Sequence, residues 1–548
     1  LTDADISGNI DVDGVTNLDV VDVDGAVNFA ADVTFADGAD IITASAGTSN
    51  FRAGVNTGNS IASGGNYNVF VGDEAGTATT TGDNNVAIGY AALDAATNSS
   101  NLTAIGYNAL TALTATGDNL STAVGAQALA ALTNGFHNVA VGYGSLDAST
   151  HGERNIAVGR DALGADTKGN YSTAIGDATL STQNFTSDTD VYNTAVGYQA
   201  GTAVTTGINN TLMGGRAGDA FTDGSSNTGI GVGALSTDTR GSRGTAVGHN
   251  ALATQNLTSQ VDTYNTAVGY AAGLILSTGI ENTLIGGLAG DALTDADYNI
   301  AIGVAALSSD TKGNRNVAIG YHALVLQNFG SSTDSYNVAV GYAAGGAVTS
   351  GTANTFLGFL SGANVTSGGG NIMIGQAEGS AAGTAHQIVI GNSQVSGVGQ
   401  DNFTFGRATL DSNIAFGATS ISAPSDERLK EDIQDETIGL AFINELRPVT
   451  FQWKKEKDIP SDMKAYVADS ETRVMNGKYN HGFIAQEVKS VIDKYDIKDG
   501  LGLWLESGED KRQRLAEGEL IPFLVKAVQE LSAKNDALEA RIKTLEGE

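Results

Sequence analysis

A short cassette recurs along most of this sequence, and its period constrains the fold more than any other feature. Each cassette is an asparagine, two or three apolar or small residues and a glycine, as in NVFVG at 68–72 and NVAIG at 85–89. The closing glycines fall at 72, 89, 106, 125, 142, 159, 176, 197, 214, 231, 248, 269, 286, 303, 320, 341, 358 and 375. Most are 17 residues apart, but those at 125, 197, 269 and 341 are 72 apart, because three units of 17 precede one of 21. This spacing indicates a unit that was duplicated in groups of four.

Each cassette predicts one short β-strand followed by a corner. The residue before the glycine is apolar, as at Val71 and Ile88, and its neighbours alternate small and apolar, as a half-buried strand requires. Glycine then permits a positive φ at the corner. Another apolar residue recurs four positions later, as at Leu93 and Leu110, and suits a second short strand. Two strands and two turns make one coil of a parallel β-roll or β-solenoid, whose units bury their apolar faces only by stacking. With 18 cassettes and rungs about 4.8 Å apart, we expect a shaft on the order of 80–90 Å long.

The recurring asparagine and the 21-residue units each allow two interpretations, one structural and one functional. Asparagine stacks well at turns and bonds neighbouring backbone, so its recurrence is best explained by structure. The longer units carry an extension that reads QNF at 183–185, QNL at 255–257 and QNF at 327–329. A tyrosine precedes the next cassette each time, at Tyr192, Tyr264 and Tyr336. Insertions in solenoids often emerge on a binding face. The apolar tips therefore either pack within the coil or contact a receptor glycan or a neighbouring subunit.

Composition divides the chain into two kinds of material near residue 424. All four prolines and both tryptophans lie at or beyond 424, whereas 35 of the 61 acidic residues and only 10 of the 29 Lys and Arg lie before 425. The net charge of −32 argues against nucleic-acid partners and anionic membrane surfaces, which it would repel. Cysteine is absent, so no disulfide holds the fold. No stretch approaches the roughly 18 apolar residues of a membrane span. No signal peptide is visible in a sequence that starts at Leu1 and not at a methionine.

Four segments are expected. Residues 1–54 form a β-structured stalk with Asp-Gly turns at 13–14 and 24–25. The ten aspartates in 1–50 match no calcium loop, so we predict that they lie in solvated turns. We predict neither a metal nor a cofactor. Residues 55–390 form the shaft, and 391–424 form a tapering distal cap, which is a candidate receptor site. Residues 425–548 are charged and glycine-poor, and predict an α+β domain ending in a coiled coil at about 520–546. Its heptad seam is Leu524, Val528, Leu531, Asn535, Leu538, Ile542 and Leu545.

The seam predicts an oligomer, in which the polar Asn535 sets the register. By itself this pattern favours two strands, so it does not establish a trimer. The shaft, however, resembles the head repeats of trimeric autotransporter adhesins through its Asn-x-Ala-Ile/Val-Gly cassette over roughly residues 55–420. Those repeats are shorter than 17 residues and form a parallel β-roll. The resemblance implies a homotrimer to which each chain contributes one roll.

The C-terminal segment carries a second resemblance. SDERLKEDI at 425–433, LRPVTF at 446–451 and HGFIAQEV at 481–488 resemble, in the expected order, the intramolecular chaperone auto-processing domain of endosialidases and phage tail fibres. In that family the domain trimerises, folds the shaft ahead of it and severs the bond before its first serine. The resemblance implies a cut between Pro424 and Ser425, with Ser425 as nucleophile and Lys430 as base. His481 and Glu487 are possible assistants, although packing within the fold explains them equally well.

From the residues alone, Ser425 and the two acids after it also fit an ordinary helix start. A serine hydroxyl attacks only when a base takes its proton, and lysine serves as that base when burial or positive charge favours its neutral form. Ser425 and Lys430 are five residues apart and would not face each other on a regular helix. A turn, or a neighbouring subunit, must therefore bring them together.

These features predict a mainly β, homotrimeric phage tail fibre located in the virion. It would bind the phage tail or baseplate through its N-terminus and a host cell-surface receptor, either a glycan or an outer-membrane component. Its serine peptidase activity would act once, in cis. Two alternatives remain open: a bacterial trimeric surface adhesin, and a glycan-degrading tailspike. The tailspike needs a pair of positioned carboxylates, whereas acids in the repeats fall mostly in turns and no inserted domain interrupts the period.

Overall fold

The computed structural model describes residues 45–418, 420–423, 425–495, 497, 502–507 and 512–547. The predicted stalk up to residue 44, and Pro424, lie outside the described residues. The chain divides into two compact units, 1–424 and 425–548.

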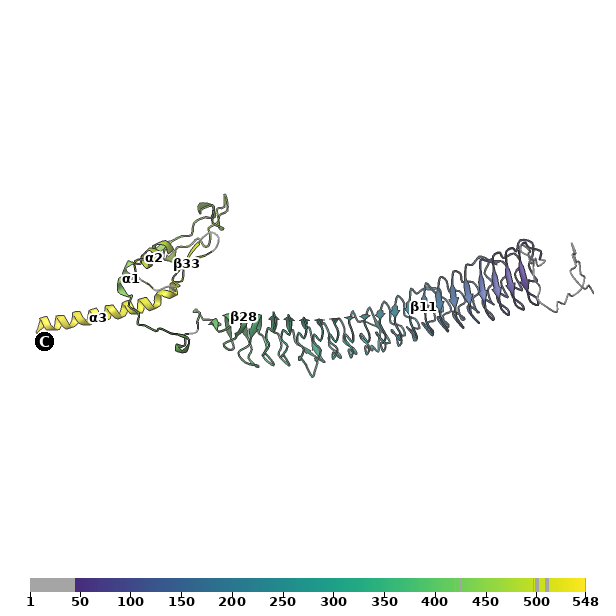
Figure 1. Ribbon diagram of the computed structural model, residues 1–548, viewed down its shortest axis with the longest axis horizontal. Helices are drawn as coiled ribbons and strands as arrows, with labels where there is room; N and C mark the ends of the chain where they lie inside the picture. The colour runs from purple at the N-terminus through teal and green to yellow at the C-terminus, as the bar shows by residue number, and fades with distance from the viewer. Residues whose placement is uncertain are drawn as a thin grey trace, which may run out of the picture. The chain divides into compact units, whose positions relative to one another are not determined.

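The first unit is a parallel β-solenoid, which confirms the fold class (Figure 1). Each coil adds one short strand to a main sheet that has 22 strands within the described residues. These strands are β1 (Phe51–Ala53), β2 (Val69–Val71), β3 (Val86–Ile88), β5 (Thr103–Ile105), β7 (Thr122–Val124), β8 (Val139–Val141), β9 (Ile156–Val158), β11 (Thr173–Ile175), β13 (Thr194–Val196), β14 (Thr211–Met213), β15 (Thr228–Ile230), β17 (Thr245–Val247), β19 (Thr266–Val268), β20 (Thr283–Ile285), β21 (Ile300–Ile302), β23 (Val317–Ile319), β25 (Val338–Val340), β26 (Thr355–Leu357), β27 (Ile372–Glu378), β28 (Gln387–Ser396), β29 (Asn402–Arg407) and β30 (Leu410–Ala415). Cassettes pair in register, so that Ala87 lies beside Ala104 of the next coil. The stacking repeats this in-register pairing from β1 to β26.

The interior of the solenoid is filled by the middle residue of each cassette and by the leucine of the following turn. Ala87 and Leu93 are both fully buried. The side chains on either side of the middle residue face outward, because successive Cβ atoms of a strand point to opposite faces. Ile88, the apolar residue before the glycine, is 37% exposed. The sheet therefore presents a second apolar surface, outside the coil.

The prediction of a second strand at the recurring leucine is wrong. Leu93, Leu110 and Leu129 lie in turns with φ of 57°, 51° and 52°. The chain reverses direction there within a few residues, so extended geometry is impossible. The coils still bond to one another: the Leu93 N–H donates to the Ala109 carbonyl at 2.9 Å. The leucine is thus a core residue, as its spacing indicated, but it lies on a corner.

Short second strands do occur elsewhere, next to the three 21-residue units and the 19-residue unit between Gly106 and Gly125. They pair in parallel as four separate two-stranded sheets. The pairs are β4 (Ser99–Ser100) with β6 (Gly117–Asp118), β10 (Gly169–Asn170) with β12 (Thr189–Asp190), β16 (Gly241–Ser242) with β18 (Val261–Asp262), and β22 (Gly313–Asn314) with β24 (Thr333–Asp334).

The cassette glycines require both their conformation and their lack of a side chain. Gly269 has φ of 139°, and a Cβ placed there would lie 2.5 Å from the carbonyl oxygen of Gly286 in the next coil. Positive φ at the corner is therefore confirmed. The close approach of successive coils adds a steric reason that the sequence pattern did not show.

The recurring asparagines form a buried ladder that joins successive coils. The Asn155 amide Nδ2 donates to the Gly169 carbonyl at 2.8 Å, and its Oδ1 accepts from the Ser172 N–H at 2.8 Å. The Asn155 N–H in turn donates to Asn138 Oδ1 at 3.0 Å. Each amide therefore satisfies backbone groups that the corner leaves without strand partners.

The distal end of the shaft departs from the regular coil. The strands β27 and β28 are longer than the others, and β29 pairs with β30 in an antiparallel hairpin. Because β30 runs antiparallel to β29, the stack of parallel strands ends at this hairpin.

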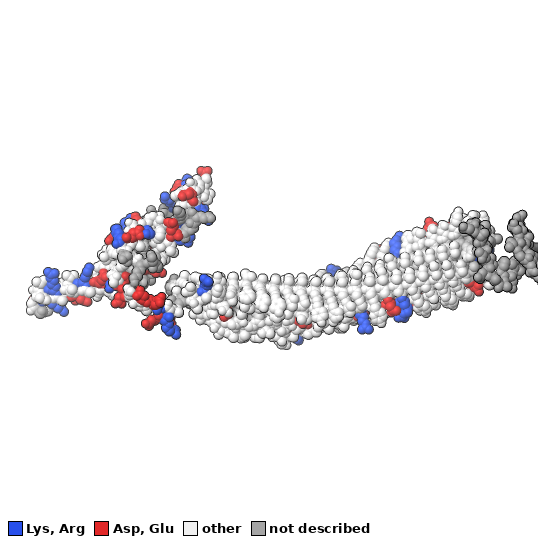
Figure 2. Space-filling view, in the orientation of Figure 1, with Lys and Arg blue, Asp and Glu red and all other residues white. Residues whose placement is uncertain are grey.

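The second unit combines helices and short antiparallel strand pairs. Its elements are η1 (Glu427–Leu429), α1 (Leu440–Glu445), β31 (Val449–Phe451), η2 (Glu456–Asp458), β32 (Asn480–Gly482), α2 (Ala485–Ile492), β33 (Trp504–Ser507), β34 (Arg512–Leu515), η3 (Glu517–Leu520) and α3 (Ile521–Glu546). A small core joins Phe442 of α1, Val488 of α2 and Phe523 of α3. Charged side chains are dense on this unit and sparse on the visible face of the shaft (Figure 2).

Candidate functional site

The candidate cleavage site lies on a single turn of 3-10 helix at the start of the second unit. η1 follows Asp426, whose Oδ1 accepts a hydrogen bond from the Arg428 N–H at 2.9 Å. The Lys430 N–H donates to the Glu427 carbonyl at 3.0 Å, after which the chain becomes extended. A short polar side chain at the N-cap is the expected way to begin such a turn. The turn curls the chain back toward Ser425.

This turn brings the two predicted catalytic residues into contact. The Lys430 ammonium donates to the Ser425 hydroxyl oxygen, with 2.8 Å between Nζ and Oγ. Of the two ways to join them that the five-residue spacing left open, the turn within one chain is the one seen. The amine lies where it can take the hydroxyl proton once it is neutral.

An ion pair between Arg428 and Asp426 stabilises the turn. The Arg428 guanidinium donates to the Asp426 carboxylate through two of its three nitrogens, at 3.0 Å from Nε to Oδ1 and 2.5 Å from Nη2 to Oδ2. These hydrogen bonds hold the pKa of Asp426 below its usual range. Sequence reasoning missed this pair, although an acid two residues before an arginine at a helix start was the available signal.

The site is open to solvent in a single chain. Ser425 and Lys430 are both exposed, and so are the apolar neighbours Leu429 at 68% and Ile433 at 64%. Lysine becomes a general base when burial or nearby positive charge favours its neutral form. Leu429 and Ile433 therefore present apolar surface beside the exposed Lys430.

The two possible assistants are placed elsewhere in the second unit. His481 on β32 shares a hydrogen bond with Thr450 of β31 at 3.2 Å. Glu487 on α2 binds the Arg447 guanidinium, which lowers the pKa of Glu487. Within the described residues, neither makes a hydrogen bond or ion pair with Ser425 or Lys430. Their printed partners are thus other residues of this unit, and the cut-site residue Pro424 lies outside the described residues.

The extensions of the 21-residue units mainly pack inward. Phe185, Leu257 and Phe329 are 7 to 8% exposed, so the packing interpretation of these tips is confirmed. Gln183 is fully buried and donates to Asp166 at 2.5 Å, while its oxygen accepts from Asn193. Burial raises the pKa of Asp166. The extension therefore completes the asparagine ladder where the regular spacing is interrupted.

The tyrosines that follow these extensions behave differently. Tyr192, Tyr264 and Tyr336 are 53%, 51% and 54% exposed. Their side chains are therefore accessible to another molecule.

The described residues hold neither a metal cluster nor a membrane-spanning helix. No group of three or more His, Asp or Glu side chains there is arranged to hold a metal ion. No helix there has the length and apolarity needed to cross a membrane.

Comparison with known proteins bears on the second unit. Residues 425–497 match the family model described as chaperone of endosialidase. The match begins at Ser425, the residue on which the two units divide. The resemblance noted from the three motifs is thereby confirmed, and a β-solenoid shaft that carries this domain is consistent with an endosialidase-type tail fibre. No curated protein matches the chain.

Proposed function

We propose that this chain, whose residues 425–497 match the chaperone of endosialidase family, is a phage tail fibre that attaches the virion to a host cell. Its C-terminal unit directs folding and assembly of the shaft and then cuts itself off between Pro424 and Ser425. The observation that carries this proposal is the 2.8 Å hydrogen bond from Lys430 to Ser425 at the first residues of the matched segment.

The chemistry of the cut follows from that hydrogen bond. Neutral Lys430 takes the proton of the Ser425 hydroxyl as Oγ attacks the carbonyl carbon of residue 424. The carbon–nitrogen bond breaks, the Ser425 amine leaves with a proton, and an ester joins residue 424 to Oγ. Water hydrolyses the ester, giving a carboxylate at 424 and a free N-terminal serine at 425. The attacking and attacked atoms belong to adjacent residues, so their effective concentration is high once the geometry is set.

Assembly as a homotrimer is part of the proposal. Each main-sheet strand turns apolar residues outward, among them Ile175, Met213 and Ile285, which are 39%, 42% and 37% exposed. Over about 18 rungs of roughly 4.8 Å and a strand width near 10 Å, this strip covers on the order of 800 Å², the area that one partner buries in a stable interface. The seam of α3 is exposed as well, with Leu531 at 56% and Ile542 at 50%.

Assembly would also complete the cleavage site. A neighbouring subunit over Leu429 and Ile433 would remove water from Lys430 and favour its neutral form. Cleavage would then follow correct assembly and could not precede it. The N-terminus would join the tail or baseplate, and the shaft would meet the host receptor.

Intact-mass spectrometry of the freshly expressed, heat-dissociated chain tests the proposal. The parent should give fragments 1–424 and 425–548, and Ser425→Ala should stay whole. Ser461→Ala is the matched control, because Ser461 is an exposed serine followed by aspartate in the same unit, and it should cut normally. A parent that stays whole would remove the assignment of Ser425 and Lys430.

A further inference from the structure

A solvent-exposed aspartate and tyrosine recur on the shaft beside each 21-residue extension. Asp190, Asp262 and Asp334 end the short strands β12, β18 and β24, and the tyrosine follows two residues later. The tyrosine hydroxyl lies 3.5, 3.3 and 3.2 Å from an oxygen of its aspartate in the three places. The sites are 72 residues and four coils apart, or about 19 Å along the shaft.

A guanidinium completes the second and third sites. Arg243 Nε lies 3.1 Å from Asp262, and its guanidinium carbon lies 5.7 Å from the centre of the Tyr264 ring. Arg315 lies 3.1 Å from Asp334 in the same way. The Arg243 and Asp262 side chains remain 55% and 45% exposed, so the pair is open to a ligand.

The first site, at Asp190 and Tyr192, has a similar set of side chains, although a tyrosine replaces the arginine. Tyr171 occupies the arginine position and stacks on Tyr192, with ring centres 5.0 Å apart. Arg154 lies over Tyr171 at 5.5 Å. An aromatic ring, a carboxylate and a guanidinium therefore gather at all three places.

The middle site is also a pocket, with a volume of about 350 Å³. It is lined by Ser225, Ser226, Ser242, Arg243, Gln260, Val261 and Asp262. That volume lies near the lower end of small-ligand sites. One valine is the only apolar residue among them, so the pocket offers hydroxyls, an amide and one charge of each sign.

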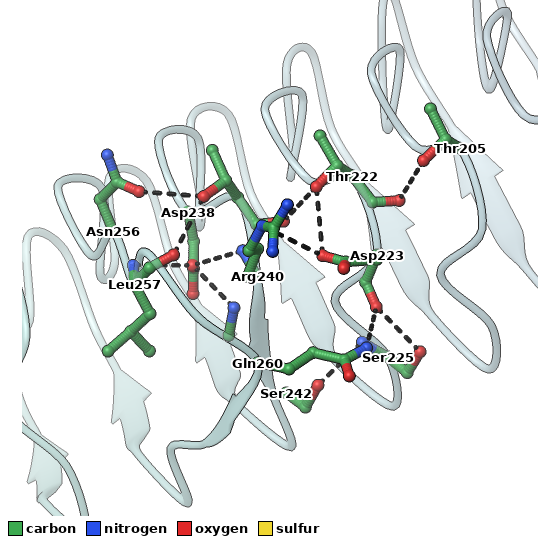
Figure 3. Close-up of polar contacts among 12 residues, drawn as sticks. Thr205, Thr222, Asp223, Ser225, Asp238, Arg240, Ser242, Asn256, Leu257 and Gln260 are labelled. Carbon is green, nitrogen blue, oxygen red and sulfur yellow. Dashed lines mark hydrogen bonds and ion pairs between the residues drawn. The ribbon is translucent and has the colours of Figure 1, made fainter.

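Contacts between coils hold this pocket in shape. Gln260 reaches back two coils to donate to the Asp223 carbonyl at 3.2 Å (Figure 3). The Ser242 hydroxyl accepts from the Ser225 N–H at 3.1 Å, and Arg240 pairs with Asp223 at 3.8 Å. The lining side chains are therefore anchored to three successive coils, which gives the preorganisation that a small ligand needs.

We propose that the pocket of Arg243, Asp262 and Gln260 beside Tyr264 binds a neutral sugar of a host surface glycan, and that the sites at Tyr192 and Tyr336 bind further units of the same chain. This inference rests on the proposed function and gives its receptor a chemical class and a place. A carboxylate and a guanidinium held together match the vicinal hydroxyls of a sugar, since one accepts and the other donates two hydrogen bonds. The exposed Tyr264 ring offers a flat surface for the apolar face of the sugar ring.

Other ligand classes fit less well. The paired charges in the pocket cancel, which gives no attraction for a sulfated or phosphorylated ligand, and the acidic chain repels polyanions. A protein partner needs a buried apolar or aromatic anchor in a pocket, and this pocket has one valine. Three weak sites spaced along a rigid shaft suit a repetitive polysaccharide, because binding to successive sites becomes intramolecular.

The test is binding of the full fibre to immobilised oligosaccharides of glucose, galactose, mannose, rhamnose and N-acetylglucosamine, with sulfated and sialylated oligosaccharides for comparison. Tyr264→Leu should weaken binding about tenfold, and the triple variant with Tyr192→Leu and Tyr336→Leu should lose it. Leucine fits this backbone, because Leu120 follows Asp118 at the equivalent place with φ of 60°. Tyr143→Leu is the matched control, since Tyr143 is 56% exposed in another column of the shaft.

Three results would overturn the inference: no binding to any neutral sugar, stronger binding to the charged sugars, or unchanged binding by the triple variant. Labelled fibre on a panel of bacterial isolates separates this failure from failure of the proposed function. If the parent and the triple variant coat the same cells equally, attachment stands and the sugar site is wrong. If the parent coats no isolate, attachment itself is contradicted.

Discussion

Lys430 and Ser425 are joined by a 2.8 Å hydrogen bond across one turn of 3-10 helix. Lys430→Met removes the base while keeping most of the volume of the side chain, so we expect cleavage to fall at least about a hundredfold. The measurement is the time course of the 1–424 fragment on denaturing gels. Lys454→Met, at another exposed lysine of this unit, should cut like the parent. Normal cleavage by Lys430→Met would assign the base to another group.

The outward apolar strip predicts that charge on the sheet surface prevents assembly. Ile175→Asp together with Ile285→Asp places two carboxylates on a face that the trimer would bury, each at a cost of several kcal/mol. Light scattering after size exclusion should show three chains for the parent and one for the variant, while circular dichroism shows that the β-structure persists. Ser187→Asp, on an exposed loop, should remain trimeric. A trimeric double variant would place the interface elsewhere.

The corner glycines predict a steep cost for a single methyl group. Gly269→Ala would place a Cβ 2.5 Å from a carbonyl oxygen at φ of 139°, so that coil must open. We expect new protease cleavage around residue 269 and a lower melting temperature. At Gly215 a Cβ would meet nothing within 4 Å, so Gly215→Ala should leave both unchanged. Equal effects of the two changes would contradict the steric explanation.

The buried asparagine ladder predicts a loss of stability when one amide is removed. Asn155→Ala leaves the Gly169 carbonyl and the Ser172 N–H without their partners, at a cost of about 1–3 kcal/mol for each group. Denaturant unfolding of the assembled fibre measures this loss, with the exposed Asn59→Ala as control. An unchanged transition for Asn155→Ala would mean that water replaces the amide.

The second unit should lose stability in acid through Glu471. Hydrogen bonds from Lys455 and Lys457 lower the pKa of Glu471 to about 2, from 4.5. A carboxyl whose pKa is depressed by folding stabilises the folded state above its unfolded pKa, and this contribution is lost as the pH falls through the folded value. Melting temperatures of the isolated fragment 425–548, released by cleavage, should therefore drop between pH 4.5 and 2. Glu471→Gln should show a shallower drop, and an identical profile would argue against the ion pairs.

The sequence by itself determined the architecture of the shaft and the nature of the tail. A period of 17 residues with a glycine at a fixed place indicates coils that repeat one conformation, and three motifs in order from Ser425 to Val488 identified the chaperone segment. It also specified which leucines are buried, because their spacing repeats with the coil.

Only the tertiary structure decided which way the strand faces. The pattern at 86–88 alternates apolar and small residues and is compatible with either side inward. Stacking buries Ala87 inside the coil, at the position that Phe70 fills in the preceding coil, and the alternation of side chains along the strand then turns Ile88 outward. The Leu93 corner, the steric need for Gly269 and the meeting of Ser425 with Lys430 likewise depend on where the chain reverses. A reversal brings together atoms from neighbouring turns or coils, whereas a local pattern carries information only about residues adjacent in sequence.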